Sequence, residues 1–242
     1  MRILGIDTTT KFLTLGIYDG TSPVRNIKHI AANEIVSNGA RVYEYSLEVG
    51  RRLSVLLVPT IKRVLDALGW QLSDIDYFVC GLGPGSFTGM RVGLATIKGL
   101  SWATKKPLIG ISTLDILARN VRYTDSQIIP IIDAKRNLIY CSIFKNRNGR
   151  LNRIRPYMLS SEKELFRNIK ANAMIFGDAV DLYKEKILMN IKGATILDKD
   201  YWYPKARNII TLAQERIKDK KLDKPFDVKP IYLYPKECQI KH

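Results

Sequence analysis

Residues 81–93 read Gly-Leu-Gly-Pro-Gly-Ser-Phe-Thr-Gly-Met-Arg-Val-Gly and lead directly into an apolar segment with helical spacing. Glycine allows the backbone to bend tightly and lets another group approach closely. The helix that follows offers free N–H groups and a partial positive charge at its start. This loop therefore suits an anion or a tightly packed neighbour. It is neither a Walker A loop, because no Gly-Lys-Ser/Thr follows, nor a GxGxxG fingerprint.

The length and composition are those of a folded globular protein. The chain has 242 residues, of which 46% are hydrophobic, and it contains no apolar run near the roughly 18 residues of a membrane span. The first acidic residue, Asp7, comes too early for the apolar core of a signal peptide. We therefore expect a cytoplasmic protein with no membrane contact.

The formal net charge of +16 raises the possibility of nucleic-acid binding. Residues 145–170 carry eight basic and two acidic side chains. Such a surface attracts phosphate, but a solvated, lysine-rich hairpin has the same composition. No RNA-reading motif with interleaved aromatic residues accompanies it, so the hairpin interpretation is favoured and direct RNA contact stays open.

Two hairpin-like segments repeat at half the chain length. Residues 2–19 and residues 129–144 each consist of β-forming runs around a polar turn that opens with an aspartate, Asp7 or Asp133. A repeat of this length predicts two similar lobes. We assign residues 1–115 to the first lobe, which the helix at 206–218 joins, residues 116–205 to the second, and residues 219–242 to an extended tail.

Further elements follow from hydrophobic spacing. We expect a helix over residues 47–68 with a kink or break at Pro59, and a helix over residues 90–104 after the glycine loop. The remaining expectations are strands at 75–80, 108–111, 173–176 and 194–197, and helices at 113–120, 161–171, 180–189 and 206–218.

Few side chains could perform catalysis. The two histidines, His29 and His242, form no HxxxH or HExxH pattern, and the three cysteines, Cys80, Cys141 and Cys238, form no CxxC. We therefore expect no catalytic residue and no metal site.

The hairpin turns hold the remaining polar candidates. Asp7 and Asp133 could hold a hydrated cation beside a nucleotide phosphate, or each could bond to its own turn backbone, which is the favoured interpretation for Asp133. Thr8, Thr9 and Thr10 could bind phosphate or serve as ordinary hairpin residues, with both alternatives open. Ser86 and Thr88 are expected to cap the following helix.

The helix at 90–104 carries small residues at a spacing of four, which places each set on one face. Gly89 and Gly93 form one set, and Ala95, Gly99 and Ala103 form the other. Faces without bulky side chains allow another backbone to approach closely. The neighbour could be the chain's own sheet or a second protein.

Four motifs resemble one known family. Residues 4–10 (Leu-Gly-Ile-Asp-Thr-Thr-Thr), 81–100, 132–136 and 230–234 together look like the bacterial TsaB (YeaZ) family. This resemblance implies an α/β fold of the two-lobed actin-like (ASKHA, ribonuclease H-like) type, with mixed sheets flanked by helices. It also implies a role in N6-threonylcarbamoyladenosine (t6A) modification of tRNA.

The family resemblance further implies a non-catalytic paralogue of the catalytic TsaD subunit, which transfers threonylcarbamoyl to adenosine 37 of tRNAs reading ANN codons. The expected partners are a TsaD-like subunit, a TsaE-like ATPase, tRNA through the complex, and a second copy of the chain when it is alone. No cofactor is expected beyond weak ATP or ADP binding within the complex. The interface maps to helices 51–68 and 90–104, with candidate residues Met90, Gly93, Leu94, Ala95, Ile97, Lys98, Gly99 and Ala103.

Two other function classes compete. The repeated Asp hairpin would suit an independent actin-like ATP-dependent kinase or transferase, although no convincing base accompanies it. Proteins of the wider family have also been labelled peptidases by analogy. This sequence has no zinc motif, which disfavours a peptidase.

Overall fold

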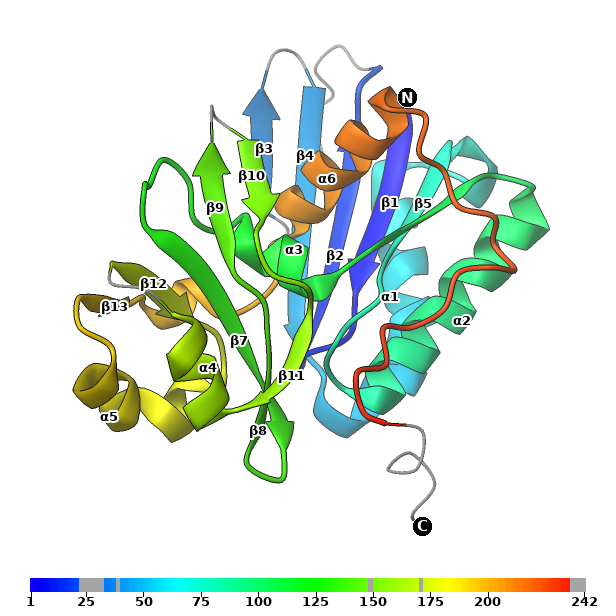
Figure 1. Cartoon of the computed structure of the whole chain (residues 1–242). Helices are drawn as coiled ribbons and strands as arrows, with labels where there is room; N and C mark the ends of the chain where they lie inside the picture. The colour runs from blue at the N-terminus through cyan, green and yellow to red at the C-terminus, as the bar shows by residue number, and fades with distance from the viewer. Residues whose placement is uncertain (22–32, 38–39, 148–149, 170–171, 236–242) are drawn as a thin grey trace. The chain divides into compact units, whose positions relative to one another are not determined.

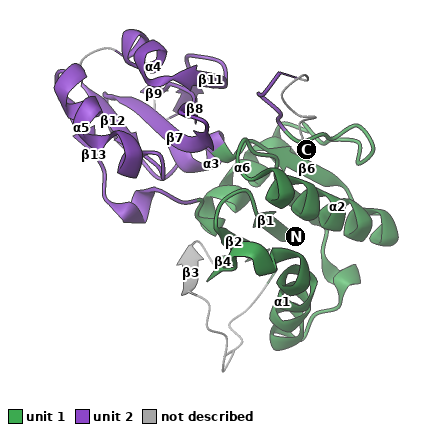
Figure 2. Ribbon diagram, turned by 90° about the horizontal axis from the view of Figure 1, so that it is seen from below, with its two compact units in different colours: residues 1–113, 204–230 green, residues 114–203, 231–242 purple. Residues whose placement is uncertain are grey.

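The computed structural model describes residues 1–21, 33–37, 40–147, 150–169 and 172–235 (Figure 1). The chain forms two compact units (Figure 2). Unit 1 comprises Met1–Thr113 and Pro204–Pro230, and unit 2 comprises Leu114–Tyr203 and Ile231–His242. Within the described residues, no helix is long and apolar enough to cross a membrane.

Unit 1 is built on a six-stranded mixed sheet in the order β3-β4-β2-β1-β5-β6. β1 and β2 form the expected antiparallel hairpin, and β2–β4 and β4–β3 are also antiparallel. β1–β5 and β5–β6 are parallel. The strands are β1 (Arg2–Asp7), β2 (Phe12–Asp19), β3 (Asn33–Ser37), β4 (Ala40–Glu48), β5 (Tyr77–Gly81) and β6 (Leu108–Ile111).

Helices cover this sheet on both faces. Leu4 and Ile6 of β1 point into a core shared with α1 (Leu53–Leu68) and α2 (Phe87–Thr104). Alternate residues face α6 (Ala206–Lys218), which lies in front of β1 and β2 in Figure 1. Short 3-10 turns at Gly50–Arg52 and Leu72–Asp74 precede α1 and β5. Unit 1 is thus a three-layer arrangement of helix, sheet and helix.

Unit 2 is also built on a mixed sheet in which an antiparallel hairpin is followed by parallel strands. Additional strands extend this sheet at one edge. β7 pairs antiparallel with β8 and parallel with β12, which pairs parallel with β13. β9 and β10 extend the sheet beyond β7, and β11 pairs with β8. The elements are α3 (Thr113–Ala118), β7 (Gln127–Lys135), β8 (Leu138–Cys141), β9 (Phe144–Arg147), β10 (Arg150–Arg153), β11 (Met158–Ser161), α4 (Glu162–Asn168), β12 (Ala173–Phe176), α5 (Val180–Asn190), β13 (Ala194–Ile196) and a 3-10 turn at Lys199–Tyr201.

The expected helix over 47–68 is wrong at its start, and of the kink or break expected at Pro59 the break does not occur. Residues 47–48 belong to β4, and the α-helix begins at Leu53. It runs through Pro59 without interruption. Proline leaves the carbonyl four residues earlier without a helical partner, and here that residue is Val55, which is 69% exposed. The proline thus lies within an uninterrupted helix, and the residue whose carbonyl loses its partner is at the surface.

The second predicted hairpin is also different in detail. Its returning strand was expected as one piece to residue 144, but β8 ends at Cys141 and β9 begins at Phe144. The interruption allows β8 to pair with β11 while β9 pairs with β10. Strands β3, β4, β10 and β11 were not anticipated, because their alternation of apolar and polar residues is incomplete.

We predict opposite effects of adding one methyl group at two glycines. A Cβ at Gly5 would lie 2.7 Å from Cγ2 of Ile209 in α6, whereas a Cβ at Gly99 would meet no atom within 4 Å. Gly5→Ala is expected to lower the free energy of unfolding by about 1–3 kcal/mol through overpacking. Gly99→Ala should raise it by about 0.4–1 kcal/mol because alanine restricts the unfolded chain.

Urea denaturation of both variants beside the wild-type protein measures these changes. A loss of stability in Gly99→Ala, or an unchanged stability in Gly5→Ala, would contradict the packing of α6 and α2 described here.

Candidate functional site

The carboxyl group of Asp7 is the most enclosed polar group at the end of β1. Asp7 is fully buried. Its Oδ1 accepts hydrogen bonds from the backbone N–H of Thr9 at 2.9 Å and from Thr9 Oγ1 at 2.8 Å. Its Oδ2 lies 2.7 Å from Oγ1 of Thr113, which is the first residue of α3. Two segments of unit 1 that are distant in the sequence therefore meet at one carboxyl group.

The hydroxyl groups of Thr9 and Thr113 also contact each other beside Asp7. Their oxygens lie 2.9 Å apart, and either hydroxyl could donate in this contact. Burial raises the pKa of Asp7, whereas the hydrogen bonds from Thr9 and Thr113 act in the opposite direction. The carboxyl group is therefore enclosed in a small hydroxyl network.

The glycine loop packs on the same hairpin turn. The Thr8 hydroxyl donates to the carbonyl of Gly89 at 2.7 Å, and the N–H of Ser86 donates to the carbonyl of Thr9 at 2.7 Å. A Cβ at Gly89 or Gly93 would collide with Thr8, and one at Gly81 would collide with Asp7. The close neighbour of this loop is thus the chain's own first hairpin.

The start of α2 follows the expected capping pattern at Ser86 but not at Thr88, which lies within the helix. Ser86 is the N-cap residue, and its Oγ accepts the backbone N–H of Gly89 at 3.2 Å. This confirms the capping role predicted for Ser86.

The proposed phosphate loop offers few free groups. Thr8 and Thr9 are each 1% exposed, and their hydroxyls are engaged within unit 1. The Thr10 hydroxyl accepts the backbone N–H of Phe12 at 3.2 Å. Phosphate binding by this turn would require breaking buried hydrogen bonds, so the structure supports the hairpin interpretation of these residues.

Asp133 in unit 2 bonds to its own turn, as favoured from the sequence. Its Oδ1 accepts the N–H of Lys135 at 2.8 Å, and its Oδ2 pairs with the Lys135 ammonium group. The Oδ1 of Asp178 accepts the N–H of Asp133 at 2.9 Å. Burial raises the pKa of Asp178. Both aspartates therefore stabilise the β7–β8 turn and the segment before α5.

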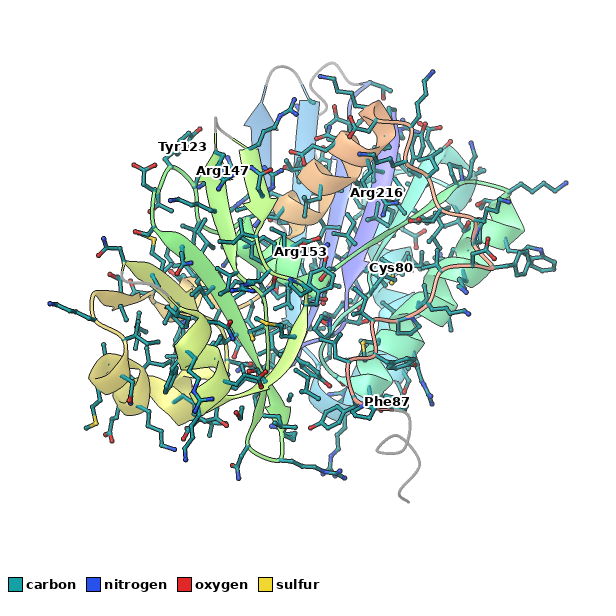
Figure 3. The ribbon with its side chains drawn as sticks, in the orientation of Figure 1. Cys80, Phe87, Tyr123, Arg147, Arg153 and Arg216 are labelled. Atoms are coloured by element: carbon teal, nitrogen blue, oxygen red, sulfur yellow. The ribbon has the colours of Figure 1, made fainter. Side chains whose placement is uncertain are left out.

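The described residues contain no group of three or more metal-binding side chains. His29, His242 and Cys238 lie outside the described residues. Cys80 and Cys141 are fully buried, and burial raises the pKa of both thiols. Figure 3 shows Cys80 in the interior of unit 1. Neither thiol is suited to act as a nucleophile.

The candidate interface residues on α2 divide into two groups. Met90, Gly93, Leu94 and Ile97 are buried within unit 1 and cannot touch a partner directly. The exposed small residues are Ala95, Gly99 and Ala103, and Lys98 is half-buried. Of the two helix faces that carry small residues, the one formed by Gly89 and Gly93 is therefore covered by the chain's own first hairpin and not by a second protein.

Half of the eight basic residues of the 145–170 region lie on the β9–β10 hairpin. Arg147 and Arg153, labelled in Figure 3, are exposed there. The guanidinium of Arg153 stacks 3.9 Å from the Tyr157 ring centroid and lies 4.0 Å from the Asp115 carboxylate. This arginine therefore has a structural role in unit 2.

The contact of Thr113 with Asp7 was not predicted from the sequence. Thr113 lies 106 residues after Asp7, and its hydroxyl both approaches the Asp7 carboxyl and accepts the N–H of Gly83 at 3.2 Å. A lone threonine at the start of a short helix carries no recognisable signal, and only the parallel pairing of β1, β5 and β6 brings it to Asp7.

Comparison with known sequences gives a consistent result. The family model of TsaD, described as tRNA N6-adenosine threonylcarbamoyltransferase, matches residues 47–234. The tRNA threonylcarbamoyladenosine biosynthesis protein TsaB of Bacillus subtilis is 29% identical over 190 residues, covering 77% of this chain and 75% of that protein. The protein of the same name in Escherichia coli is 29% identical over 153 residues, covering 62% and 58%.

Solved structures show the fold. The Pseudomonas aeruginosa YeaZ structure has a TM-score of 0.74 at 20% identity and covers 96% of this chain and 100% of its own. A second Pseudomonas aeruginosa structure, described as similar to peptidase YEAZ, has a TM-score of 0.77 at 21% identity, covering 96% and 99%. These matches confirm the expected actin-like α/β fold with two mixed sheets.

The raised pKa of Asp7 predicts a specific pH dependence of stability. Because the pKa of Asp7 is raised in the folded state, the unfolded chain ionises first, and stability falls as pH rises above about 4 until the folded pKa is reached. Asparagine reproduces the neutral carboxyl, since its Nδ2 donates to Thr113. Urea denaturation between about pH 4 and pH 7 should show Asp7→Asn gaining on the wild type by up to about 1.4 kcal/mol per pH unit.

Asp7→Ala is the comparison variant and should be less stable than Asp7→Asn by about 3 kcal/mol at every pH, because neither variant titrates at this position and alanine leaves the buried hydroxyls of Thr9 and Thr113 short of partners. A wild type that gains stability over Asp7→Asn as pH rises would show that Asp7 is ionised in the fold.

We also predict weak nucleotide binding by the isolated chain, because the polar groups of residues 7–10 are already bonded within unit 1. Titration calorimetry with Mg-ATP should show little heat. A submicromolar dissociation constant would contradict this and favour an independent ATP-dependent enzyme.

Proposed function

The chain belongs to the TsaB (YeaZ) branch of the TsaD family, and from this membership we propose that it acts in t6A modification of tRNA as a non-catalytic subunit. In this proposal a TsaD-type subunit performs the transfer of threonylcarbamoyl to adenosine 37. The present chain binds and activates that subunit. A TsaE-type ATPase joins the pair, tRNA reaches the complex in the cytoplasm, and the chain alone forms a homodimer.

The observation that carries the proposal is the exposed face of α1 and α2. These two helices pack against each other. Val55 and Val58 of α1 are 69% and 53% exposed, and Ala95, Gly99 and Ala103 of α2 are exposed as well. Exposed valines on one helix, and exposed residues without bulky side chains on the helix packed against it, allow a partner helix to approach closely and bury apolar area.

The enclosure of Asp7 supports the non-catalytic part of the proposal. A carboxyl group that holds a hydrated cation beside a phosphate must reach solvent, but Asp7 is fully buried. The independent kinase or transferase therefore loses its main support, which was the Asp hairpin. Any ATP or ADP would bind weakly, in the assembled complex.

Gly99→Leu tests the docking face. The position is exposed and a Cβ there meets no atom within 4 Å, so the fold of the monomer should tolerate the larger side chain. A partner helix seated on this face would clash with the leucine, at a cost of about 1–3 kcal/mol. We expect co-purification with the TsaD-type subunit to weaken by about ten-fold or more, since 1.4 kcal/mol corresponds to a factor of ten.

Glu185→Leu on α5 is the matched control, because it also adds an exposed leucine but lies in unit 2. It should leave co-purification and t6A formation unchanged. Normal association of a folded Gly99→Leu variant would exclude this face of α2 as the interface.

A further inference from the structure

A groove at the C-terminal end of α2 is separate from the Asp7 network and adjoins the docking face at Ala103, which belongs to both. Its volume is about 700 Å³, within the range of small-ligand sites. It lies wholly in unit 1, between the end of α2 and the segment that follows α6. The lining residues that matter are Trp102, Lys105, Lys106, Asp223 and Lys224.

The aromatic component is an exposed tryptophan. Trp102 is 71% exposed, whereas the other two tryptophans, Trp70 and Trp202, are 7% and 5% exposed. Exposed tryptophan is uncommon on a surface that serves only solubility. A free indole face beside cations is the arrangement on which nucleic-acid bases stack.

The charge of the groove is positive. Lys105 and Lys224 are exposed and form no ion pair among the described residues. The Lys106 ammonium lies 3.7 Å from the Asp76 carboxylate. The acidic lining residue, Asp223, is already neutralised, because its Oδ1 lies 3.0 Å from Arg216 Nη2 and its Oδ2 accepts the Gly110 N–H at 2.8 Å.

Both sides of the groove are held by backbone contacts. The N–H groups of Lys105 and Lys106 donate to the carbonyls of Trp102 and Ser101, which closes the helix in a Schellman arrangement. Lys105 occupies the left-handed position at φ +57°, where glycine is usual. On the other side, the N–H of Asp223 donates to the Leu108 carbonyl of β6 at 3.1 Å. The indole and the lysines are therefore presented on fixed backbone.

We propose that this groove is a binding site for single-stranded RNA, in which a base stacks on Trp102 and the neighbouring phosphates pair with Lys105 and Lys224. This goes beyond the proposed function, in which tRNA reaches the chain only through the complex. The choice of RNA over other polyanions rests on that function. An acidic peptide would use the lysines but gain little from the exposed indole.

The test measures binding of a fluorescein-labelled 12-nucleotide single-stranded RNA to the isolated full chain by anisotropy over a series of salt concentrations. Trp102→Ala should weaken binding by about ten-fold through loss of stacking, and Trp102→Phe should retain most of the affinity. Lys105→Gln with Lys224→Gln should reduce the slope of log K against log salt by about 1.4, at about 0.7 per lost phosphate contact. RNA should also quench the tryptophan fluorescence of the wild-type protein, whereas it should not quench that of Trp102→Ala.

The matched controls are Tyr123→Ala, which removes another exposed aromatic ring (Figure 3), and Lys184→Gln, which removes an exposed charge on α5. Both should bind RNA like the wild type. Equal losses in controls and groove variants would show attraction by net charge alone and overturn the proposal. Trp102-dependent binding of an oligoglutamate peptide without RNA binding would also overturn it.

Failure of this proposal is distinguishable from failure of the t6A role, because RNA binding is measured on the isolated chain and t6A formation in the reconstituted complex. The variants change exposed side chains, and circular dichroism with thermal melting verifies that each is folded.

Discussion

The buried carboxyl group of Asp7 is the interaction on which the arrangement of unit 1 depends. It joins the end of β1 to the first residue of α3 through Thr9 and Thr113. Thr8, the next residue along the chain, holds the glycine loop through its bond to Gly89. An enclosed polar group must have its hydrogen bonds satisfied, so the absence of side chains at Gly81, Gly89 and Gly93 is a consequence of the space that Asp7 and Thr8 occupy. A motif that suggests anion binding thus serves to close the protein's own interior.

Helix α2 then divides into three regions with different environments. Its first turns pack on the hairpin through Gly89 and Gly93. Its middle exposes Ala95 and Gly99, where space remains for a second helix. Its end contributes Trp102 to a basic groove. One helix can in this way be fixed to its own sheet and still present neighbouring surfaces, which meet at Ala103, to a protein and to a polyanion.

Local signals in the sequence predicted much of the fold. Strands β6 and β12 and helix α6 have the expected bounds, because their apolar runs end at clear turn or charge signals. The start of α1 was wrong because Leu47 fits a helical period although its backbone pairs with Leu13 of β2. Such pairing is decided by distant segments and leaves no local trace.

The candidate site was harder to predict for the same reason. The turn role of Asp133 follows from residues next to it, whereas the hydrogen-bond network around Asp7 needs Thr113 and the groove needs Lys224, which is 122 residues from Trp102. The buried and the exposed interface candidates on α2 recur at the same helical spacing. Periodicity alone therefore does not indicate which face of the helix packs on the sheet.

The central claim is that the Asp7 network is structural and that catalysis belongs to a partner. Its most direct test is t6A formation by a complex reconstituted from the TsaD-type and TsaE-type subunits with threonylcarbamoyl-adenylate and tRNA, with and without this chain. The account predicts no sustained t6A formation when the chain is omitted and wild-type rates when Asp7→Asn replaces it. A folded, associated Asp7→Asn protein that fails to support t6A formation would show that the carboxyl group takes part in the reaction and would contradict the account.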